Sequence, residues 1–209
     1  MDHIIKMKPK GLMKPRDVLV IDDFLTPSYH LELYNLLMGR NFPWSYAHNI
    51  TNTTADGEYG GFGSFGFEHW ILQFERAQMV DCNSPVKQLI MPFLFQVQDV
   101  IGECKPIRSR IDMTLYNPEK FVHGVHTDLT GIFHWSCVYY VNNSDGETII
   151  YNAHEEDSVI TEADLSPSNV KKVVEPRANR VVIFDGNYYH TGHSPAVNKN
   201  RVIINSNFK

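Results

Sequence analysis

Residues 121–135, FVHGVHTDLTGIFHW, hold three histidines and one aspartate, side-chain types that bind metal ions when they lie close together. His126 and Asp128 are two positions apart, in a stretch where apolar residues partly alternate as in a β-strand. Because residues i and i+2 of a strand point to the same face, this imidazole and this carboxylate can take neighbouring positions on one metal. A solvated strand that is merely rich in histidine would look the same, so the pair needs support from elsewhere.

The third ligand of such a site has to come from another segment. Residues 181–195, VVIFDGNYYHTGHSP, offer His190 and His193 after a stretch typical of a buried strand. Two histidines and one carboxylate on one face of an octahedron leave the other face open, which is the arrangement of non-haem Fe(II) oxygenases. Arg201 follows, and its planar fork suits the far carboxylate of a dicarboxylate that chelates the metal at its other end.

Two helices are predicted before these motifs. Residues 18–21 read as a short strand, and Thr26 and Pro27 then begin a helix that Gly39 can end. Residues 84–102 repeat this pattern, with Pro92 as a point where the helix can kink. One face of the second helix is expected in the core because apolar residues recur there at helical spacing: Leu89, Ile90, Phe93, Val97, Val100 and Ile101.

From about residue 107 the pattern changes to the two-residue period of β-strands. Short strands separated by turn residues predict an all-β sandwich or barrel against which the helices pack. The Asp-Gly pair in NNSDGET, residues 142–148, predicts a hairpin between two of these strands. The predicted strands are IRSRIDMTLYN, IFHWSCVYYV, ETIIYNA, VKKVVEP, NRVVIFD and RVIINSNF.

Residues 56–70, DGEYGGFGSFGFEHW, mix five glycines with aromatic side chains. Such a segment is either a passive loop or a flap that closes over a ligand. The sequence leaves both alternatives open.

The order of these features resembles the Fe(II)- and 2-oxoglutarate-dependent oxygenases, and most closely their prolyl 4-hydroxylase-like branch. VIDDFLTPSYHLELYNLL is similar to the entry strand and helix of that branch, and LYNPEKFVHGVHTD resembles its tyrosine, loop and HxD motif. YYVNNSDGETIIY resembles its strand and GGET stretch, with Asp-Gly in place of Gly-Gly. The resemblance covers most of the chain and is strongest over residues 110–208.

The resemblance implies a mainly β fold, a double-stranded β-helix (jelly roll, cupin-like) with buttressing N-terminal helices. We expect one domain over residues 1–209, with helical support mainly in 24–105 and the β-helix core mainly in 107–209.

The resemblance also implies roles for individual residues. It makes His126, Asp128 and His190 the iron ligands, although the family spacing also permits His193 as the third. Arg201 would pair with the far carboxylate of 2-oxoglutarate, and Tyr116 would donate a hydrogen bond to the same carboxylate. His123 and His134 take no part in the motif and are interpreted as ordinary strand histidines.

The implied activity is that of a dioxygenase that uses Fe(II), 2-oxoglutarate and O2, with ascorbate as a candidate reductant. It would hydroxylate an unknown substrate, a protein or peptide prolyl residue or a small molecule, and release succinate and CO2. One alternative is a catalytically inactive jelly-roll protein that only binds a metal or another ligand. A second is a zinc hydrolase with the same ligands, which Arg201 and the lack of a recognisable general-base motif disfavour.

Composition limits the partners and the location. The net charge of −5 and the absence of a basic stripe predict no nucleic-acid partner. No apolar run reaches the ~18–20 residues that span a bilayer, so no membrane partner is expected. Three cysteines without a CxxC pair indicate free thiols, and the N-terminus has no signal-peptide pattern, so we expect a cytoplasmic protein. The sequence does not indicate the oligomeric state.

Overall fold

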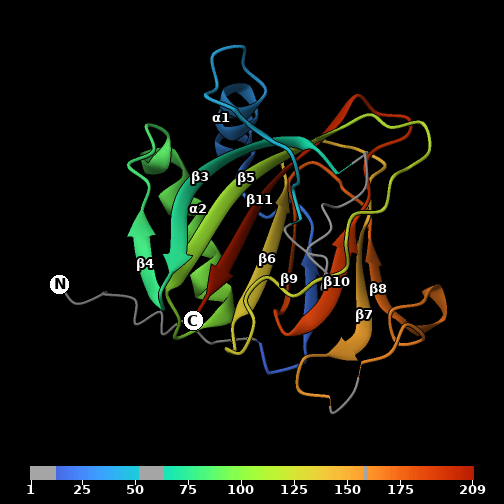
Figure 1. Cartoon of the computed structure of the whole chain (residues 1–209). Helices are drawn as coiled ribbons and strands as arrows, with labels where there is room; N and C mark the ends of the chain where they lie inside the picture. The colour runs from blue at the N-terminus through green and yellow to red at the C-terminus, as the bar shows by residue number, and fades with distance from the viewer. Residues whose placement is uncertain (1–12, 52–63, 158–159) are drawn as a thin grey trace.

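The computed structural model describes residues 13–51, 64–157 and 160–209. Its strands form two antiparallel sheets with an apolar core between them (Figure 1). The larger sheet has eight strands: β1 (Val18–Ile21), β2 (Ser45–Ala47), β3 (Gly66–Glu75), β4 (Gln78–Asp81), β5 (Pro106–Leu115), β6 (Trp135–Tyr140), β9 (Arg180–Asp185) and β11 (Asn200–Phe208). The smaller sheet has three: β7 (Thr148–His154), β8 (Val170–Val174) and β10 (Tyr188–Gly192).

The strand order is that of a jelly roll. It runs β1-β9-β6-β11-β5-β3-β2 in the larger sheet, where β4 pairs with β3, and β10-β7-β8 in the smaller one. The chain crosses from one sheet to the other between β6 and β7, between β8 and β9, and again around β10. The predicted mainly β fold with N-terminal helices is confirmed.

The central strands of the larger sheet have two different faces. On β11, Val202 and Ile204 pack into the core on the helix side, whereas Ile203 packs into the core between the sheets. Because side chains alternate along a strand, Arg201 shares the inner face with Ile203. Polar side chains on this face are therefore enclosed between the two sheets, where a ligand can be surrounded.

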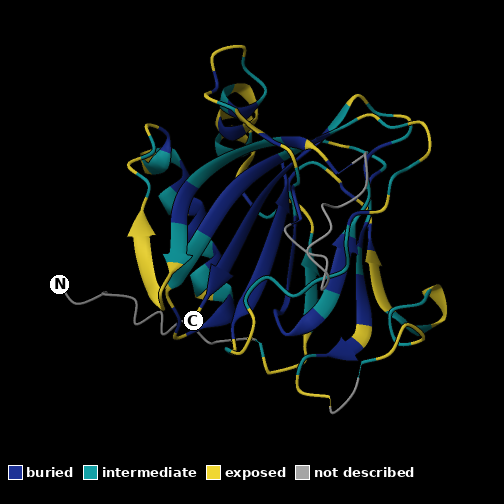
Figure 2. Ribbon diagram, in the orientation of Figure 1, coloured by how far each residue is buried: buried dark blue, intermediate teal, exposed yellow. Residues whose placement is uncertain are grey.

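Two helices cover the outer face of the larger sheet: α1 (Pro27–Leu37) and α2 (Lys87–Ile101). Figure 2 shows the central strands as buried and β4 as exposed at one edge. As predicted, α1 begins at Pro27 after Thr26, and α2 is capped by Gly102, whose φ of 114° favours glycine. Neither helix of the described chain is long and apolar enough to cross a membrane.

Tyr29 of α1 explains how α2 continues through Pro92. A proline inside a helix disturbs the backbone hydrogen bonds of the preceding turn. Here the Tyr29 hydroxyl donates to the carbonyl of Leu89 (2.5 Å) and accepts from the N–H of Phe93 (2.9 Å). These two backbone groups would bond to each other in an undisturbed helix, so the hydroxyl bridges the opened turn.

Replacing Tyr29 with phenylalanine should lower the free energy of unfolding by about 1–3 kcal/mol, because a buried donor and acceptor lose their partner. Urea denaturation of the variant measures this change. Tyr34→Phe is the matched control, since Tyr34 lies on the same helix and is 37% exposed. Equal unfolding midpoints for the two variants would show that water replaces the bridging hydroxyl.

The predicted hairpin at residues 142–148 is wrong. The strands on either side of Asp145 and Gly146, β6 and β7, lie in different sheets. The Asp145 carboxylate instead accepts hydrogen bonds from the backbone N–H groups of residues 196–198, at 2.8, 2.9 and 2.9 Å. This aspartate fixes the loop before β11 rather than a two-stranded turn.

Two other segments differ from their interpretation. Residues 66–70 of the glycine-rich stretch form the start of β3. Residues 56–63 lie outside the described chain, so the structure does not decide whether they form a passive loop or a flap. Residues 121–128 form no regular strand; the structure has only isolated bridges there, at Val122 and His126.

Candidate metal centre

Backbone pairing between two distant segments brings two of the predicted ligands together. The N–H of His126 donates to the carbonyl of His190 (3.0 Å), and the N–H of His190 donates back to the carbonyl of His126 (2.9 Å). This exchange pins the loop before Asp128 against β10 and places the two imidazole centroids 4.5 Å apart. The register of one bridge therefore aligns side chains that are far apart in the sequence.

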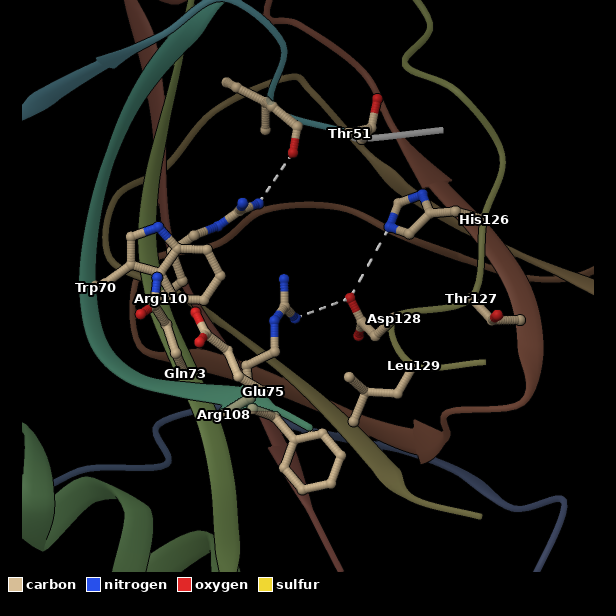
Figure 3. Close-up of a pocket in the computed structure, with 12 residues that line it drawn as sticks. Thr51, Trp70, Gln73, Glu75, Arg108, Arg110, His126, Thr127, Asp128 and Leu129 are labelled. Atoms are coloured by element: carbon tan, nitrogen blue, oxygen red, sulfur yellow. Dashed lines mark hydrogen bonds and ion pairs between the residues drawn. The ribbon is translucent and has the colours of Figure 1, made fainter. Parts of the chain in front are cut away.

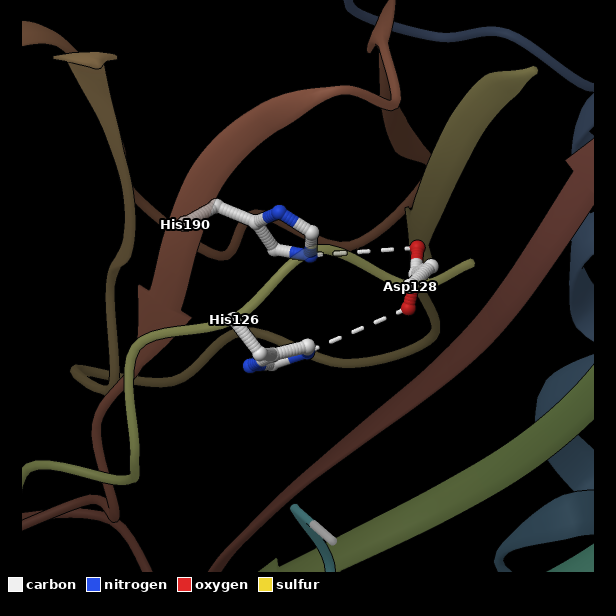
Figure 4. A group of neighbouring side chains, drawn as sticks. All are labelled: His126, Asp128 and His190. Carbon is white, nitrogen blue, oxygen red and sulfur yellow. Dashed lines mark ion pairs between the residues drawn. The ribbon is translucent and has the colours of Figure 1, made fainter. Parts of the chain in front are cut away.

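Both imidazoles point toward the Asp128 carboxylate (Figure 4). The Nε2 atom of His126 lies 3.9 Å from Oδ1 of Asp128, and the Nε2 atom of His190 lies 3.8 Å from Oδ2. One donor atom from each of the three residues lies within 4.8 Å of the other two, close enough to hold one ion.

Hydrogen bonds to backbone carbonyls fix the ring orientation and the tautomer of His126 and His190. Nδ1 of His126 faces the carbonyl of Gly124 at 2.9 Å, and Nδ1 of His190 faces the carbonyl of Tyr188 at 3.0 Å. Because a carbonyl only accepts, each Nδ1 carries the proton and each Nε2 presents its lone pair. Burial lowers the pKa of His126 to about 4, so this imidazole is neutral at pH 7 and able to bind a cation.

Asp128 is held as a carboxylate by a set of donors. Arg108 Nη1 contacts Oδ1 at 3.2 Å, and the Ser136 hydroxyl donates to Oδ2 at 2.7 Å. The side-chain amides of Asn205 and Asn207 donate to the same carboxylate, at 3.2 and 2.9 Å. Burial opposes ionisation, but electrostatic interactions with the nearby His190 ring and the Arg108 guanidinium outweigh it and hold the Asp128 pKa well below its usual range.

The prediction that His126 and Asp128 share one face of a strand is wrong in its geometry. The backbone between them is irregular, and only His126 forms a bridge. Their convergence depends on the donors around Asp128, which come from β5, β6 and β11.

His193 lies outside the cluster. It is three residues after His190, and residues three apart on a strand point to opposite faces. Its backbone N–H donates to the carbonyl of Glu147 (3.1 Å), and it pairs with Val122 in an isolated bridge. The structure thus brings His190, and not His193, next to His126 and Asp128.

A buried cavity extends from the histidines to Arg201, which is 5% exposed. Arg201 Nη2 donates to the Thr148 hydroxyl (2.8 Å), which also accepts from the Tyr140 hydroxyl (2.8 Å). The Arg201 guanidinium lies 5.6 Å from the centroid of the Tyr140 ring. A cation and an alcohol therefore line the far end of the cavity, and the Tyr140 phenol packs against both.

Several buried polar atoms of this cavity have no hydrogen-bond partner within the described part of the chain. They are Nε of Arg201, Nδ1 of His123, Oγ1 of Thr114 and Oδ1 of Asn205. Buried polar groups are normally satisfied, so these atoms fit a polar ligand that enters the cavity. A dicarboxylate chelating the metal at one end and pairing with Arg201 at the other matches this set.

The structure does not bring Tyr116 into the cavity. Its side chain is 53% exposed beyond the end of β5, and it does not line the space around Arg201. Tyr140 and Thr148 occupy the position next to the guanidinium instead. The sequence does contain a signal for Tyr140: it is two residues from Val138 on β6, and both face the core between the sheets.

His123 is also a lining residue, although the sequence interpretation gave it no role. Ser194 Oγ lies 3.2 Å from its Nε2, and burial lowers its pKa to about 3. A neutral, buried imidazole at this place can donate or accept one hydrogen bond.

A second cavity of about 360 Å³ lies on the other side of His126 and Asp128 and does not reach Arg201 (Figure 3). Both cavities are lined by His126, Arg110, Ile50 and Thr51. Space for a second molecule is therefore present beside the candidate ligands.

Comparisons with known proteins agree with this geometry. Residues 111–209 match the family model of the 2OG-Fe(II) oxygenase superfamily. A search of the curated proteins gives no match to the sequence.

Three solved structures illustrate the likeness of the fold. An oxidoreductase of the 2OG-Fe(II) oxygenase family from Burkholderia pseudomallei has a TM-score of 0.66 at 12% identity, over 92% of this chain and 85% of that chain. A Pseudomonas putida prolyl-4-hydroxylase has a TM-score of 0.58 at 13% identity, over 93% and 92%. The epimerase SnoN, in complex with Fe3+, alpha ketoglutarate and nogalamycin RO, has a TM-score of 0.61 at 10% identity, over 92% and 78%.

These identities establish the fold alone, whereas the family match covers the segment that carries His126, Asp128, His190 and Arg201. Fold, family match and converging side chains agree: residues 111–209 are similar to the 2OG-Fe(II) oxygenase superfamily, and the rest of the chain completes the fold that its solved members share.

Proposed function

We propose that His126, Asp128 and His190 hold Fe(II), and that Arg201 binds the far carboxylate of 2-oxoglutarate. The enzyme would then hydroxylate a substrate in the second cavity and release succinate and CO2. The observation that carries this proposal is the convergence of two Nε2 atoms and one carboxylate within 4.8 Å, at the point where the two cavities meet.

Iron, when bound, would supply the redox chemistry that couples decarboxylation of 2-oxoglutarate by O2 to oxidation of the substrate. Ascorbate is proposed as the reductant that keeps this iron in the Fe(II) state. The contributions of the chain itself are binding, orientation and exclusion of water.

The ligand residues would keep the metal in one place without taking all of its positions. The two histidines are fixed through Nδ1 by backbone carbonyls, so their rings cannot turn away. Asp128 is fixed by Arg108, Ser136 and Asn207. Three protein ligands on one side leave the opposite side for a chelating cosubstrate and O2.

Arg201 would orient 2-oxoglutarate. It lies on the inner face of β11, and Thr148 and Tyr140 hold its guanidinium. Arg201 forms no ion pair with an acidic side chain of the described chain. A carboxylate of the cosubstrate could therefore bind its guanidinium without first breaking such an ion pair. The other end of the cosubstrate would then face the metal ligands.

The alternatives explain fewer observations. An inactive jelly roll would have no need for both the ligand cluster and a buried, carboxylate-free arginine. A zinc hydrolase accounts for the cluster but not for the polar atoms that line the way to Arg201.

The substrate is proposed only by class: a small molecule, or a prolyl residue of a peptide or protein. The solved structures with this fold include a prolyl-4-hydroxylase and an enzyme holding nogalamycin RO, so the fold does not choose between them. Nucleic acid is disfavoured by the net charge of −5. All three cysteines are free, which supports the proposed cytoplasmic location.

The test is to strip the protein with a chelator, add back Fe(II) and 2-oxoglutarate without O2, and record the charge-transfer absorption of an Fe(II)–2-oxo acid chelate. O2 is then admitted and succinate is measured. We expect the absorption band and slow, iron-dependent succinate release, and neither with Zn(II). Absence of the band in a folded, iron-loaded protein would refute the proposed cosubstrate site, whether or not a substrate is known.

A further inference from the structure

The second cavity contains an arginine whose bonding differs from that of its neighbour. Arg108 and Arg110 both lie on the inner face of β5, with guanidinium carbons 5.3 and 5.0 Å from the centroid of the Trp70 ring. Both line the cavity beside Asp128 (Figure 3).

A bulge in β3 builds the wall of this cavity. Trp70 pairs with Arg110, but the next partner along, Ser109, pairs with Leu72, so one extra residue is inserted in β3. Ile71 and Leu72 both point into the core on the helix side, at 0% and 2% exposure. Trp70 therefore shares the cavity with Gln73 and Glu75, which an unbroken alternation would place on the opposite face.

Arg110 is already contacted at all three of its nitrogens by groups of the chain. Its Nε contacts Asp112 Oδ1 at 2.6 Å, its Nη1 contacts Glu68 Oε2 at 3.1 Å, and its Nη2 donates to the carbonyl of Ile50 at 3.0 Å. Two carboxylates and a carbonyl use its whole fork, so it supports the cavity wall.

Arg108 uses only one of its nitrogens. Its Nη1 donates to Asp128 Oδ1 (3.2 Å) and to Asn207 Oδ1 (2.8 Å), whereas its Nε and Nη2 make no hydrogen bond within the described chain. The side chain is 13% exposed, and its guanidinium points into the cavity in Figure 3. Half of a planar fork is thus presented to whatever occupies this space.

The only anionic partner of Arg108 within the described chain is Asp128, the candidate metal ligand. Fe(II) would bring two positive charges to that carboxylate. Of the two carboxylates of 2-oxoglutarate, only one would lie next to the metal, since the other would pair with Arg201. Asp112 and Glu68 are both engaged by Arg110 and do not contact Arg108 within the described chain. The Asp128 carboxylate would therefore be shared between Arg108 and the metal, and Glu75 is a further carboxylate that lines the same cavity.

We infer that the substrate of this enzyme carries a carboxylate, which binds to Nε and Nη2 of Arg108 while the rest of the molecule fills the cavity beside Trp70. This inference rests on the proposed function. A carboxylate matches the free side of the fork in shape, because its two oxygens can accept parallel hydrogen bonds from Nε and Nη2. The Glu75 carboxylate in the same cavity disfavours a dianion such as a phosphate. Glu75 lies at the exposed end of β3 and lines this cavity, where it would oppose a second negative charge on the substrate.

The experiment uses the whole protein loaded with Mn(II) and saturated with 2-oxoglutarate, so that Arg201 is occupied. The probes are matched acids and amides: phenylacetate with phenylacetamide, and N-acetyl-L-proline with N-acetyl-L-prolinamide. Paramagnetic relaxation of the probe protons by Mn(II) reports binding next to the metal. At least one acid should bind tenfold or more tightly than its amide.

Arg108→Gln should remove this preference, and Arg108→Lys should retain part of it, because a point charge cannot reproduce the fork. The matched control is Arg177→Gln, an exposed arginine that pairs with Glu175 in the part of the chain that the structure describes, which should leave the preference unchanged. If Arg108→Gln does not hold Mn(II), Arg108→Lys decides: an unaltered acid preference in it overturns the inference.

Three results of the probe titration would overturn the inference: no acid preference in the wild type, a preference that survives in Arg108→Gln, or tighter binding of phenylphosphonate than of phenylacetate. Mn(II) and 2-oxoglutarate binding are measured first. A wild-type protein that binds both without preferring acids refutes the carboxylate substrate alone. A protein that binds neither refutes the proposed function instead.

Discussion

Replacing His126 or His190 with alanine should abolish Fe(II) binding and 2-oxoglutarate turnover, while His193→Ala should leave both close to wild type. Each of the first two changes removes one of the three proposed ligands. Losing a residue that only supports a ligand already lowers metal affinity about 10–100-fold, so losing a ligand itself should lower it by roughly 100-fold or more. His193 is not in the cluster, because it points to the other face of its segment.

The measurement is a metal titration of each purified variant, followed by succinate release at saturating 2-oxoglutarate. Circular dichroism before the titration confirms that the variants are folded. If His193→Ala loses iron and His190→Ala retains it, the assignment of the third ligand has to be reversed.

Asp128→Ala should also lose iron, both because a proposed ligand is removed and because the fold is destabilised. It leaves the partly buried Arg108 without its counter-ion, and breaking a buried pair typically destabilises a protein by about 3–5 kcal/mol, which is an upper bound here. Asp128→Asn keeps the volume and is the better variant for separating loss of a ligand from loss of stability.

The helices and most strands follow from local patterns in the sequence. Thr26 and Pro27 favour the start of a helix, and Gly102 favours the end of one, through their own backbone preferences. In the structure α1 begins at Pro27, and α2 ends just before Gly102. The two-residue period after residue 107 predicts β5, β6, β7, β8, β9 and β11. Neither pattern says which strands pair, which is why the hairpin at Asp145 was wrong.

The bulge in β3 could not be predicted for a related reason. Ile71 and Leu72 are adjacent apolar residues, and a sequence of this kind fits a bulge, a turn or an irregular loop equally well. Only pairing with β5 shows that one residue is extra, and only then do Gln73 and Glu75 reach the second cavity.

The ligand residues were predicted from spacing and resemblance, and the structure places His126, Asp128 and His190 together as expected. The reason given for the first pair was still wrong, since no regular strand carries them. For Tyr116 the resemblance supplied a role that its exposed side chain does not support, whereas Tyr140 contacts the arginine. Contacts of that kind depend on how β6 and β11 pair, which local sequence does not encode.

Arg201→Ala should weaken 2-oxoglutarate binding about 30-fold or more and leave metal affinity nearly unchanged. Arg201 is 5% exposed and would form a buried charge pair with the far carboxylate of the cosubstrate. Leaving one partner of such a pair buried and alone costs about 2–5 kcal/mol, and 2 kcal/mol already corresponds to roughly 30-fold in affinity. The metal should be spared, because Arg201 contacts none of the three candidate ligands.

Three comparisons make this result specific to the fork of Arg201. Arg201→Lys should restore only part of the affinity, since an ammonium cannot bind a carboxylate through two parallel hydrogen bonds. Arg180→Ala is the matched control, because Arg180 lies on the same sheet and pairs with Asp22 at the surface. Pyruvate, which lacks the far carboxylate, should bind the wild type poorly and should be little affected by Arg201→Ala.

The apparent affinity for 2-oxoglutarate is measured at saturating Fe(II) from succinate release. If Arg201→Ala leaves that affinity unchanged, the far carboxylate must bind to another group, and the cavity between His190 and Arg201 is then not the cosubstrate site.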